Sequence, residues 1–445
     1  MPPSSSPLKA VRGTRDLLPP ETALWNRVET VARGVFARYG FGEIRTPIFE
    51  DTQLFARGVG EETDIVSKEM YTWEDRARAQ SEKAQSLTLR PENTAGVVRA
   101  YIEHKLGERG ELQKLFYIGP QFRRERPQRG RYRQFWQIGV EVLGPVSSGA
   151  ESPVRDAEVL EMLATLLDEL GIKDWRLELN SVGSSEDRKR YNAALREALA
   201  PVKDRMCEDN QRRAETNPLR VLDSKEPADQ EIIDALPKIA DFLDADSTAH
   251  FQAVRTALDA CGVAYTVNPR LVRGLDYYTR TTFEFTVLDG QGLGTQNALL
   301  GGGRYDGLSE MLGGPKAPGI GFAIGEDRLI LTLQAQDGRE GVNAPHPEWM
   351  WAQKLDAYIA PMGVERNAAA LALGRELRRA GLSVEVGDGS FRLKKSFEAA
   401  DKVARHIIIL GEDEVTTGTA TVKTFATGEQ AKVELAALRA HLKTI

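Results

Sequence analysis

Residues 114–141 constrain the fold most, because two strand-like runs are separated by only a short basic loop. The first run covers residues 114–119 and the second covers residues 134–141. A connection this short joins neighbouring antiparallel strands, since parallel strands need a longer crossover. The segment therefore predicts a hairpin within a sheet. Residues 137 and 141 are four apart, so their side chains lie on one face of the second strand.

The loop of this predicted hairpin, residues 123–133, is unusually rich in arginine. It holds six arginines and no lysine, in a chain whose 59 basic and 65 acidic residues give a net charge of −6. The planar guanidinium group binds phosphate through two parallel hydrogen bonds. Two interpretations follow: a solvated hairpin tip, or a phosphate site on the strand with nucleic-acid contacts from the loop.

A second candidate segment is residues 271–280, where Arg273 precedes a glycine and Tyr277 and Tyr278 are adjacent. Neighbouring residues of a regular strand face opposite sides, so the two tyrosines are not expected on one face of a strand. Paired tyrosines are also typical of core or edge packing. The segment is therefore open to a structural or a functional interpretation.

Residues 290–325 hold 12 of the 40 glycines. They contain no phosphate-binding P-loop motif, and residues 319–325 miss the spacing of a dinucleotide-binding fingerprint. Glycines in strands more often mark the close approach of a ligand or a neighbouring backbone. A helix is predicted to follow, with Arg328 in its first turn. A cation opposes the helix dipole there, so an anion is expected nearby.

A fourth segment, residues 89–94, places polar side chains directly after a short strand. A helix cap is the default interpretation. A functional role depends on the other segments.

The rest of the chain predicts a multidomain organisation, since 445 residues correspond to about three domains. We expect a helix after Pro20 that ends at Gly40, a strand at 41–46, and an exposed loop at 74–86. Residues 184–259 are helical in pattern and dense in charge. A proline-containing linker at 344–347 precedes alternating strands and helices, which predict a small parallel or mixed sheet.

Composition excludes several classes of protein. Two cysteines cannot build a disulfide framework, and the five histidines are not spaced with them as zinc ligands are. Neither a signal peptide nor an apolar run of 18 residues is found. We therefore expect a soluble cytoplasmic protein.

Taken together and in this order, these segments resemble the histidyl-tRNA synthetase family of class II aminoacyl-tRNA synthetases. Residues 11–19 are similar to the N-terminal segment of the family, and residues 122–135 to its motif 2. Residues 271–278 are similar to its histidine-specific sequence, and residues 319–328 to its motif 3. Residues 217–225 are similar to part of its helical insertion.

The resemblance implies an α+β catalytic domain with a mixed, mainly antiparallel sheet flanked by helices, a helical insertion and a C-terminal α/β anticodon-binding domain. The implied boundaries are 1–183 and 260–340 for the two parts of the catalytic core, 184–259 for the insertion, and 354–445 for the anticodon-binding domain. A homodimer is implied through residues 21–50, with Pro47 near the interface.

The resemblance also implies a two-step reaction. ATP, carrying Mg²⁺, activates L-histidine to histidyl-adenylate, and the histidyl group then passes to tRNA(His). Arg123 and Arg273 carry the catalytic roles. The residues implied to bind ATP are Arg123, Glu125 and Arg328. Those implied to contact the tRNA acceptor end are Arg126, Gln128 and Arg129. The histidine-binding residues implied by the resemblance are Glu92, Asn93, Thr94, Arg123, Gln137, Glu141, Arg273, Tyr277 and Tyr278.

Within this set, the imidazole of histidine has one donor and one acceptor, which a buried carboxylate and a phenol satisfy. Glu141 and Tyr278 are the matching positions. Asn93 departs from the family, because many relatives have glycine there. No protein-held metal site is expected beyond the Mg²⁺ of ATP.

Two rival interpretations remain. A non-catalytic paralogue, the regulatory subunit of ATP phosphoribosyltransferase, resembles the catalytic core but usually lacks the C-terminal domain. Another class II synthetase, prolyl or threonyl, is disfavoured by residues 273–278. Exchange of pyrophosphate into ATP with each amino acid separates the three.

Overall fold

The computed structural model describes residues 7–60, 63, 65–75, 84–275, 277–287, 297–336 and 354–443. The chain divides into two compact units, Met1–Asn343 and Ala344–Ile445. The proposed linker at 344–347 and most of the 74–86 segment lie outside the described residues. Within the described ranges, no helix combines the length and the apolar character needed to cross a membrane.

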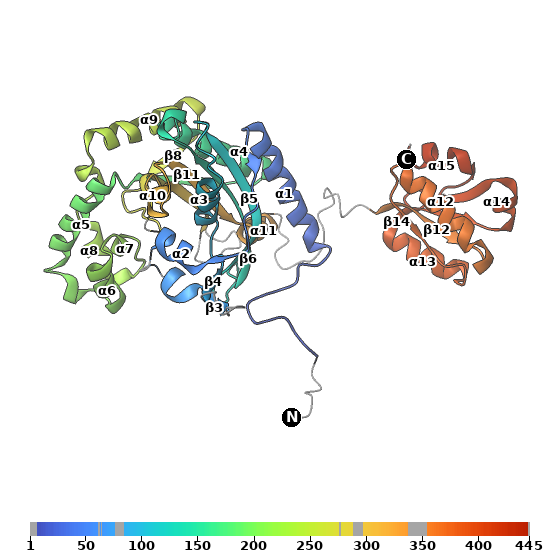
Figure 1. The fold of residues 1–445 in the computed structure, drawn as a ribbon. Coiled ribbons are helices and arrows are strands. Elements are labelled where there is room, and N and C mark those ends of the chain that lie inside the picture. Colours follow the sequence, from blue (N-terminus) through green and yellow to red (C-terminus); the bar gives the residue numbers. More distant parts are fainter. Residues whose placement is uncertain are drawn as a thin grey trace. The chain divides into compact units, whose positions relative to one another are not determined.

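The first unit is built on an eight-stranded sheet (Figure 1). Its strand order is β1-β5-β6-β11-β10-β9-β7-β8. Only the outermost pairs, β1 with β5 and β7 with β8, are parallel. The expected mixed, mainly antiparallel sheet is thereby confirmed. The strands are β1 (Gly42–Glu43), β5 (Gln113–Phe122), β6 (Gln134–Leu143), β7 (Trp175–Ser181), β8 (Tyr265–Val267), β9 (Thr279–Val287), β10 (Ala298–Arg304) and β11 (Gly319–Gly325).

The basic hairpin is the pair β5 and β6, as the short connection predicts. The two strands are antiparallel, with Leu115 opposite Glu141 and Gly119 opposite Gln137. On its other side β6 pairs with β11, where Glu141 faces Gly321. The strand that carries Gln137 and Glu141 is therefore interior to the sheet, with hydrogen-bonded neighbours on both sides.

The N-terminal helix α1 (Glu21–Arg38) begins after Pro20, as predicted. Gly40 follows its end with φ of +78°, a conformation that costs glycine little. The strand expected at 41–46 is shorter, because β1 covers only Gly42–Glu43. The carbonyl oxygens of Thr46 and Pro47 accept hydrogen bonds from the Arg90 guanidinium at 2.9 and 3.3 Å, in place of strand pairing.

A three-stranded sheet of order β2-β4-β3 lies beside the main one in the chain's first unit. The prediction of a loop throughout residues 74–86 is wrong at both ends, because Glu74 of β3 pairs with Ser86 of β4. Their polar side chains are compatible with a sheet that has one solvated face. The strands are β2 (Phe49–Asp51), β3 (Tyr71–Asp75) and β4 (Gln85–Leu89).

Further helices cover the sheets of the first unit. A π-helical turn precedes β3, and a short helix lies between β10 and β11. The elements are α2 (Thr52–Val59), η1 (Ile65–Glu69), α3 (Thr94–Glu103), η2 (Val146–Ser148), α4 (Pro153–Leu170), α10 (Leu308–Met311) and α11 (Glu326–Gln336).

A block of helices lies in the chain between β7 and β8, so it is inserted between two strands of one sheet. Ser184 and Asp187 form the capping box that starts this block. Its core includes Tyr191, Leu195 and Val221. Figure 1 shows α5 to α8 gathered at one edge of the unit. The elements are α5 (Ser185–Leu199), η3 (Lys203–Arg205), α6 (Glu208–Thr216), α7 (Leu219–Leu222), η4 (Pro227–Asp229), α8 (Gln230–Asp234), η5 (Ile239–Phe242) and α9 (Ala245–Cys261).

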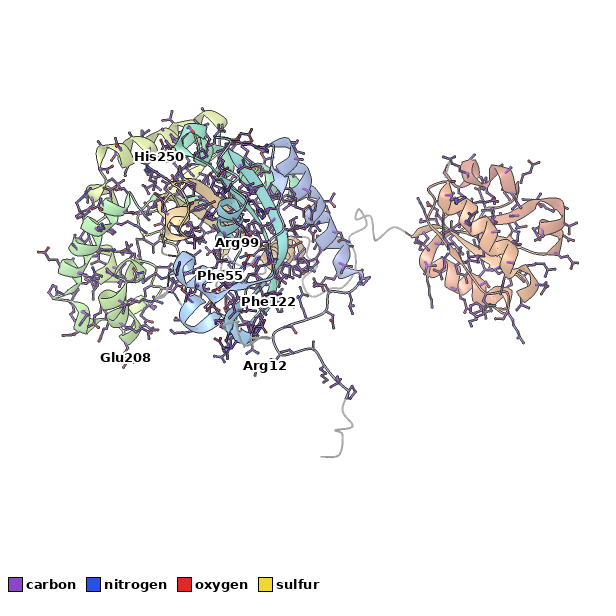
Figure 2. The ribbon with its side chains drawn as sticks, viewed as in Figure 1. Arg12, Phe55, Arg99, Phe122, Glu208 and His250 are labelled. Carbon is purple, nitrogen blue, oxygen red and sulfur yellow. The ribbon has the colours of Figure 1, made fainter. Side chains whose placement is uncertain are left out.

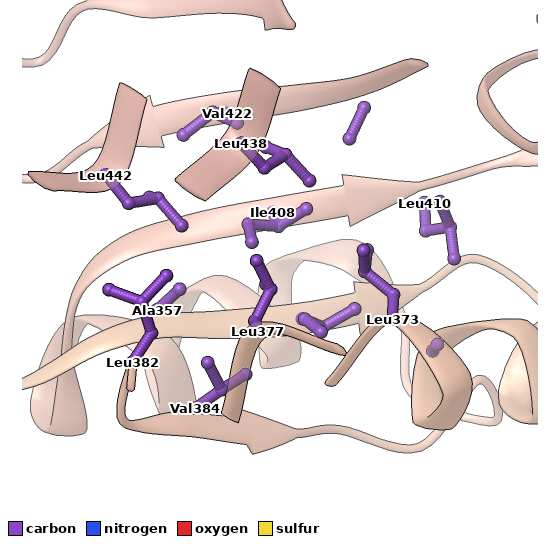
Figure 3. Close-up of a cluster of buried hydrophobic side chains, with 13 residues drawn as sticks. Ala357, Leu373, Leu377, Leu382, Val384, Ile408, Leu410, Val422, Leu438 and Leu442 are labelled. Carbon is purple, nitrogen blue, oxygen red and sulfur yellow. The ribbon is translucent and has the colours of Figure 1, made fainter. Parts of the chain in front are cut away.

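The second unit has a five-stranded sheet of order β13-β12-β14-β15-β16. The predicted alternation of strands and helices is present, and β12 pairs in parallel with β13 and β14. The antiparallel strands β15 and β16 extend the sheet beyond the prediction. Figure 3 shows its core around Ile408 and Leu377. The elements are β12 (Leu355–Pro361), η6 (Val364–Arg366), α12 (Asn367–Arg379), β13 (Val384–Val386), α13 (Leu393–Val403), β14 (Ala404–Leu410), α14 (Glu412–Thr417), β15 (Thr419–Thr424), β16 (Gln430–Glu434), η7 (Leu435–Ala437) and α15 (Leu438–Lys443).

A buried ionic cluster joins the sheet to two helices of the first unit. Asp156 on α4 accepts from Arg304 Nε at 2.8 Å, and both side chains are fully buried. The second Asp156 oxygen lies 2.8 Å from His250 Nε2, and the other ring nitrogen of His250 lies 3.2 Å from Arg280. His250 lies on α9 in Figure 2. The last helix of the insertion is thereby fixed to β9 and β10.

Replacement of Asp156 by alanine tests this cluster. The substitution leaves the Arg304 guanidinium buried without its main counter-charge, which should cost about 3 kcal/mol of unfolding free energy. The measurement is urea unfolding followed by tryptophan fluorescence. Glu169→Gln is the control, because it removes an ion pair with Arg38 in which both side chains are exposed; about 1 kcal/mol or less is expected. Equal losses in both variants would contradict this account.

Candidate functional site

A cavity of about 830 Å³ lies over the centre of the main sheet, between strands β6, β11 and β10 and residues of the helical insertion. Its volume is typical of small-molecule sites. It gathers candidates from all four sequence segments, although these are far apart in the chain. The candidates that line it are Glu92, Thr94, Arg123, Glu125, Gln137, Arg273, Tyr277, Tyr278 and Arg328.

Cations from three segments meet in this cavity. Arg123 stacks on Phe135 and donates from Nε to the Pro91 carbonyl at 2.9 Å. Arg328 lies in the first turn of α11, as predicted, and donates to the Ala298 carbonyl at 2.6 Å. Burial and then the nearby Arg131 lower the pKa of the Arg328 guanidinium from its ordinary value. The cavity wall therefore carries several guanidinium groups interleaved with carboxylates such as Glu125 and Asp327, and the guanidinium groups are the part of the wall that suits an anion.

Arg273 reaches the cavity across a glycine. A Cβ atom added to Gly301 would lie 2.4 Å from the Arg273 guanidinium carbon, so a larger residue there would displace the guanidinium group from this position. Arg273 forms an ion pair with Glu284 of β9. The pKa of Arg273 is raised: burial is the largest single influence and lowers it, but Glu284, Tyr278 and Asp223 together outweigh burial. The guanidinium group is thus held charged in a buried position.

Tyr277 and Tyr278 both line the cavity. Adjacent residues of a regular strand would face opposite sides, but neither tyrosine lies in a strand, so that restriction does not apply to them. β9 begins only at Thr279, so the strand-like run predicted from Leu271 is irregular up to that point. The two rings are 4.8 Å apart and both are buried. They also pack in a core cluster with Tyr305, so packing and cavity lining coexist. Asp276 lies outside the described residues.

Glu141 is buried beneath the cavity wall. Its Oε1 accepts from the Thr94 hydroxyl at 2.7 Å, and its Oε2 accepts from the Tyr305 hydroxyl at 2.6 Å. A Cβ atom on Gly321 would lie 1.9 Å from Oε2, so the neighbouring strand needs glycine there. Burial raises the pKa of Glu141 to about 8, against the effect of the two hydroxyls.

Glu92 has a structural and a cavity-facing role together. Its two carboxylate oxygens accept from the backbone N–H groups of Thr94 and Ala95 at 2.7 and 3.0 Å, which caps α3. The helix cap expected at this segment is therefore supplied by Glu92, because Asn93 at the N-cap position makes no capping hydrogen bond with its side chain. Burial raises the pKa of Glu92, and the two backbone donors oppose the shift. Asn93 is buried and does not line the cavity; its Oδ1 accepts from Thr46 at 2.7 Å.

Gln137 carries a polar atom that is ready for a ligand. Its side chain lines the cavity, and its Oε1 is buried without a hydrogen-bond donor among the described residues. A buried acceptor without a donor is costly. A donor on a bound molecule would satisfy it.

Some side chains of the basic loop, residues 123–133, line the cavity, and others are exposed to solvent. Arg123, Glu125 and Arg131 line the cavity, whereas Arg126, Gln128 and Arg129 are exposed. A second cavity of about 1200 Å³ lies between the sheet and α6, α7 and α8, and shares residues with the first. Basic side chains from loop and insertion line it, among them Arg131, Arg213 and Lys225.

Two residues of the site were missed by sequence reasoning. Glu284 holds Arg273, and Tyr305 holds Glu141. Glu284 had a weak signal, because it is a carboxylate between two phenylalanines of an apolar run. Tyr305 had none, since its partner is 164 residues away in the chain.

Comparisons with known proteins cover almost the whole chain. Residues 13–329 match the family model "Histidyl-tRNA synthetase", and residues 356–445 match "Anticodon binding domain". A histidine--tRNA ligase of Koribacter versatilis is 67% identical over 98% of this chain and 96% of its own length. One from Solibacter usitatus is 53% identical over 98% and 99%. The apo histidyl-tRNA synthetase of S. aureus has a TM-score of 0.79 and 38% identity, covering 98% of this chain and 100% of that one.

The titration of Glu141 gives a prediction about stability. Its pKa is raised on folding, so between pH 4.5 and about 8 the folded protein holds a proton that the unfolded chain has released. The unfolding free energy contributed by this group therefore falls as pH rises through that window, by at most about 1.4 kcal/mol per pH unit. Urea unfolding of the native protein and Glu141→Gln at pH 5 to 8 measures the difference. A pH-independent difference would contradict the raised pKa.

Proposed function

The chain belongs to the histidyl-tRNA synthetase family, and from this premise we propose how its cavity carries out the reaction. The protein activates L-histidine with ATP, giving histidyl-adenylate and pyrophosphate, and then transfers histidine to the 3′ end of tRNA(His). In the first step a carboxylate oxygen of histidine bonds to the α-phosphorus as the bond to pyrophosphate breaks. In the second, the 3′-terminal adenosine hydroxyl attacks the histidyl carbonyl and AMP leaves.

The ATP polyphosphate binds among the cavity cations. Arg123 and Arg328 bind the nucleotide. The observation that supports this assignment most directly is that both line the same cavity. The lowered pKa of Arg328 reflects burial and repulsion from Arg131, and a bound anion favours the charged guanidinium against both. Glu125, whose carboxylate lies 3.4 Å from Arg131 and 3.8 Å from Arg123, is placed to meet the adenine side.

Arg273 stabilises the charge that develops on the α-phosphate. Fixed cations in a buried site favour the transition state because no solvent has to reorganise. The passage over Gly301 and the ion pair with Glu284 fix the guanidinium group before substrate arrives. Arg123 is the second cation at this phosphate.

Mg²⁺ enters with ATP and supplies charge neutralisation on the phosphates when bound. Hard oxygen ligands suit this ion, and Glu125 and Glu284 are carboxylates of the cavity wall. Both are already paired with arginines. The phosphates therefore provide most of the ligands in this proposal.

Histidine is recognised by groups on both sides of the cavity. The α-amino group binds at Glu92 and Thr94, with Asn93 shaping the backbone between them. Gln137 offers its unpaired Oε1 to the amino-acid end of the substrate. The imidazole nitrogens meet Tyr278 on one side, and on the other Glu141, which lies beneath the wall and reaches the cavity through the hydroxyls of Thr94 and Tyr305. Tyr277 packs beside them. Loss of either partner would leave a buried polar group unpaired, which is how such sites reject analogues.

The tRNA acceptor end is proposed to contact the exposed tip residues Arg126, Gln128 and Arg129 of the basic loop. The C-terminal unit is an anticodon-binding domain, and the anticodon of tRNA(His) is its proposed ligand. We further propose a cytoplasmic homodimer formed through residues 21–50.

The specificity prediction is pyrophosphate exchange into ATP with histidine alone among the twenty amino acids, without tRNA. This isolates the activation step and the choice of amino acid. Exchange with another amino acid would discard the histidine pocket. The regulatory paralogue is less supported, since full-length relatives are ligases; no exchange from the folded protein would revive it.

The catalytic prediction concerns Arg273→Ala. Removing a fixed charge from a buried transition-state site should lower kcat of exchange about 100- to 1000-fold. Arg255→Ala is the matched control, because Arg255 lies on α9 and contacts Gln252 and Tyr265 outside the cavity. Unchanged exchange in Arg273→Ala would remove this residue from the mechanism.

A further inference from the structure

Residues 270–274 lie between the helical insertion and the catalytic sheet, and contact both. Arg270 and Val272 contact the insertion, whereas Arg273 reaches the cavity and Glu284 of β9. The residue proposed to stabilise the α-phosphate is therefore carried by a segment held from both sides.

Arg270 is bound to the insertion through its whole guanidinium group. Nη1 donates to Asp234 Oδ1 at 2.9 Å, and Nη2 donates to Gln230 Oε1 at 2.9 Å. Longer contacts join the group to the carbonyls of Leu222 and Ser224 at 3.4 and 3.5 Å. All four partners belong to α7, α8 and the residues around them. The Arg270 side chain thereby links two helices of the insertion, α7 and α8, to this segment.

Val272 adds an apolar anchor. It is 8% exposed and belongs to the core of the insertion, with Val221, Leu222 and Ile233. Arg220 of α7 also lies over the adjacent Gly274, with its nitrogens 3.6 and 3.9 Å from where a Cβ atom would be. Displacement of α7 would therefore act on the chain on both sides of Arg273.

The other side of the segment is fixed to the sheet. The amide of Asn180 on β7 donates to the Leu271 carbonyl at 3.0 Å. The Arg270 backbone N–H donates to Asn268 Oδ1 at 3.0 Å, and the Asn268 amide donates to Glu178 at 2.6 Å. These bonds fix the chain before Arg273. The contacts of Arg270 and Val272 with the insertion then determine the path of the chain into Arg273.

We propose that Arg270 is a positioning residue for Arg273, and that the helical insertion takes part in histidine activation through it. Arg270 lines the adjoining cavity of about 1200 Å³ and not the one of about 830 Å³. Because its guanidinium group is bonded to Asp234 and Gln230 of the insertion, we assign its effect to the segment and not to contact with ATP or histidine. The inference rests on the proposed role of Arg273. It makes the insertion part of the activation step, which proceeds without tRNA.

The test is a double-mutant cycle in the full-length protein, measured as pyrophosphate exchange with histidine and without tRNA. Arg270→Gln should lower kcat about tenfold with little change in either KM, since a displacement of about 1 Å at a reacting group is costly. In the Arg273→Lys background the same substitution should have no further effect, because coupled residues are not additive. Arg270→Lys, which keeps the charge facing Asp234, should restore part of the rate.

Several outcomes separate the alternatives. Equal loss from Arg270→Gln in both backgrounds, or a rise in KM with unchanged kcat, would overturn the inference. Wild-type exchange in Arg273→Lys alone would instead overturn the proposed role of Arg273, and the coupling with it. Lys203→Gln is the control for loss of an ion pair within the insertion, here with Glu215; its exchange should equal that of the native protein.

A second variant distinguishes loss of positioning from a folding defect in Arg270→Gln. Asp234→Asn leaves Arg270 intact and removes one partner whose side chain is 66% exposed. It should lower kcat about two- to threefold, and this loss should also disappear in the Arg273→Lys background. Persistence of the loss there would overturn the inference even if Arg270→Gln did not fold.

Discussion

A carboxyl group buried in the interior of a sheet sets the architecture of the site. Glu141 lies on a strand with neighbours on both sides, and glycine is needed opposite it at Gly321. Its two oxygens draw in hydroxyls from α3 and from the residue after β10, namely Thr94 and Tyr305. Because an unpaired buried carboxyl is costly, these elements have to meet at one place. The cavity forms above that meeting point.

The cations of the cavity are positioned in a comparable way by other residues of its wall. Arg273 depends on Gly301 for its path and on Glu284 for its direction. Arg328 is turned towards the cavity by the start of α11, where the helix dipole disfavours a cation. Burial and Arg131 disfavour the charge of Arg328 in the unliganded protein, and a bound polyanion offsets that cost. The charge of Arg273 is already compensated by Glu284, so that guanidinium group is in place before a ligand binds.

Local patterns in the sequence were sufficient for much of the fold. The hairpin of β5 and β6, helix α1 and the alternating elements of the second unit follow from short-range spacing, so each could be predicted. Strands β15 and β16 were missed, as was the irregular path of residues 271–278, because pairing partners and packing decide them. For the site, the resemblance located candidates in four segments, and nine of these side chains line one cavity. Glu284 and Tyr305 escaped, because their importance depends on partners distant in sequence or on the fold of the segment they hold.

The strand order has a consequence for synthesis of the chain. β6 ends at Leu143, yet its second neighbour β11 begins at Gly319, with the whole insertion between them. A nascent chain that has not reached β11 leaves one edge of β6 unpaired and Glu141 without Tyr305. Unpaired edges of this kind are where growing chains associate wrongly. Translation speed over the intervening residues, and access of chaperones to that edge, therefore bear on the yield of native protein.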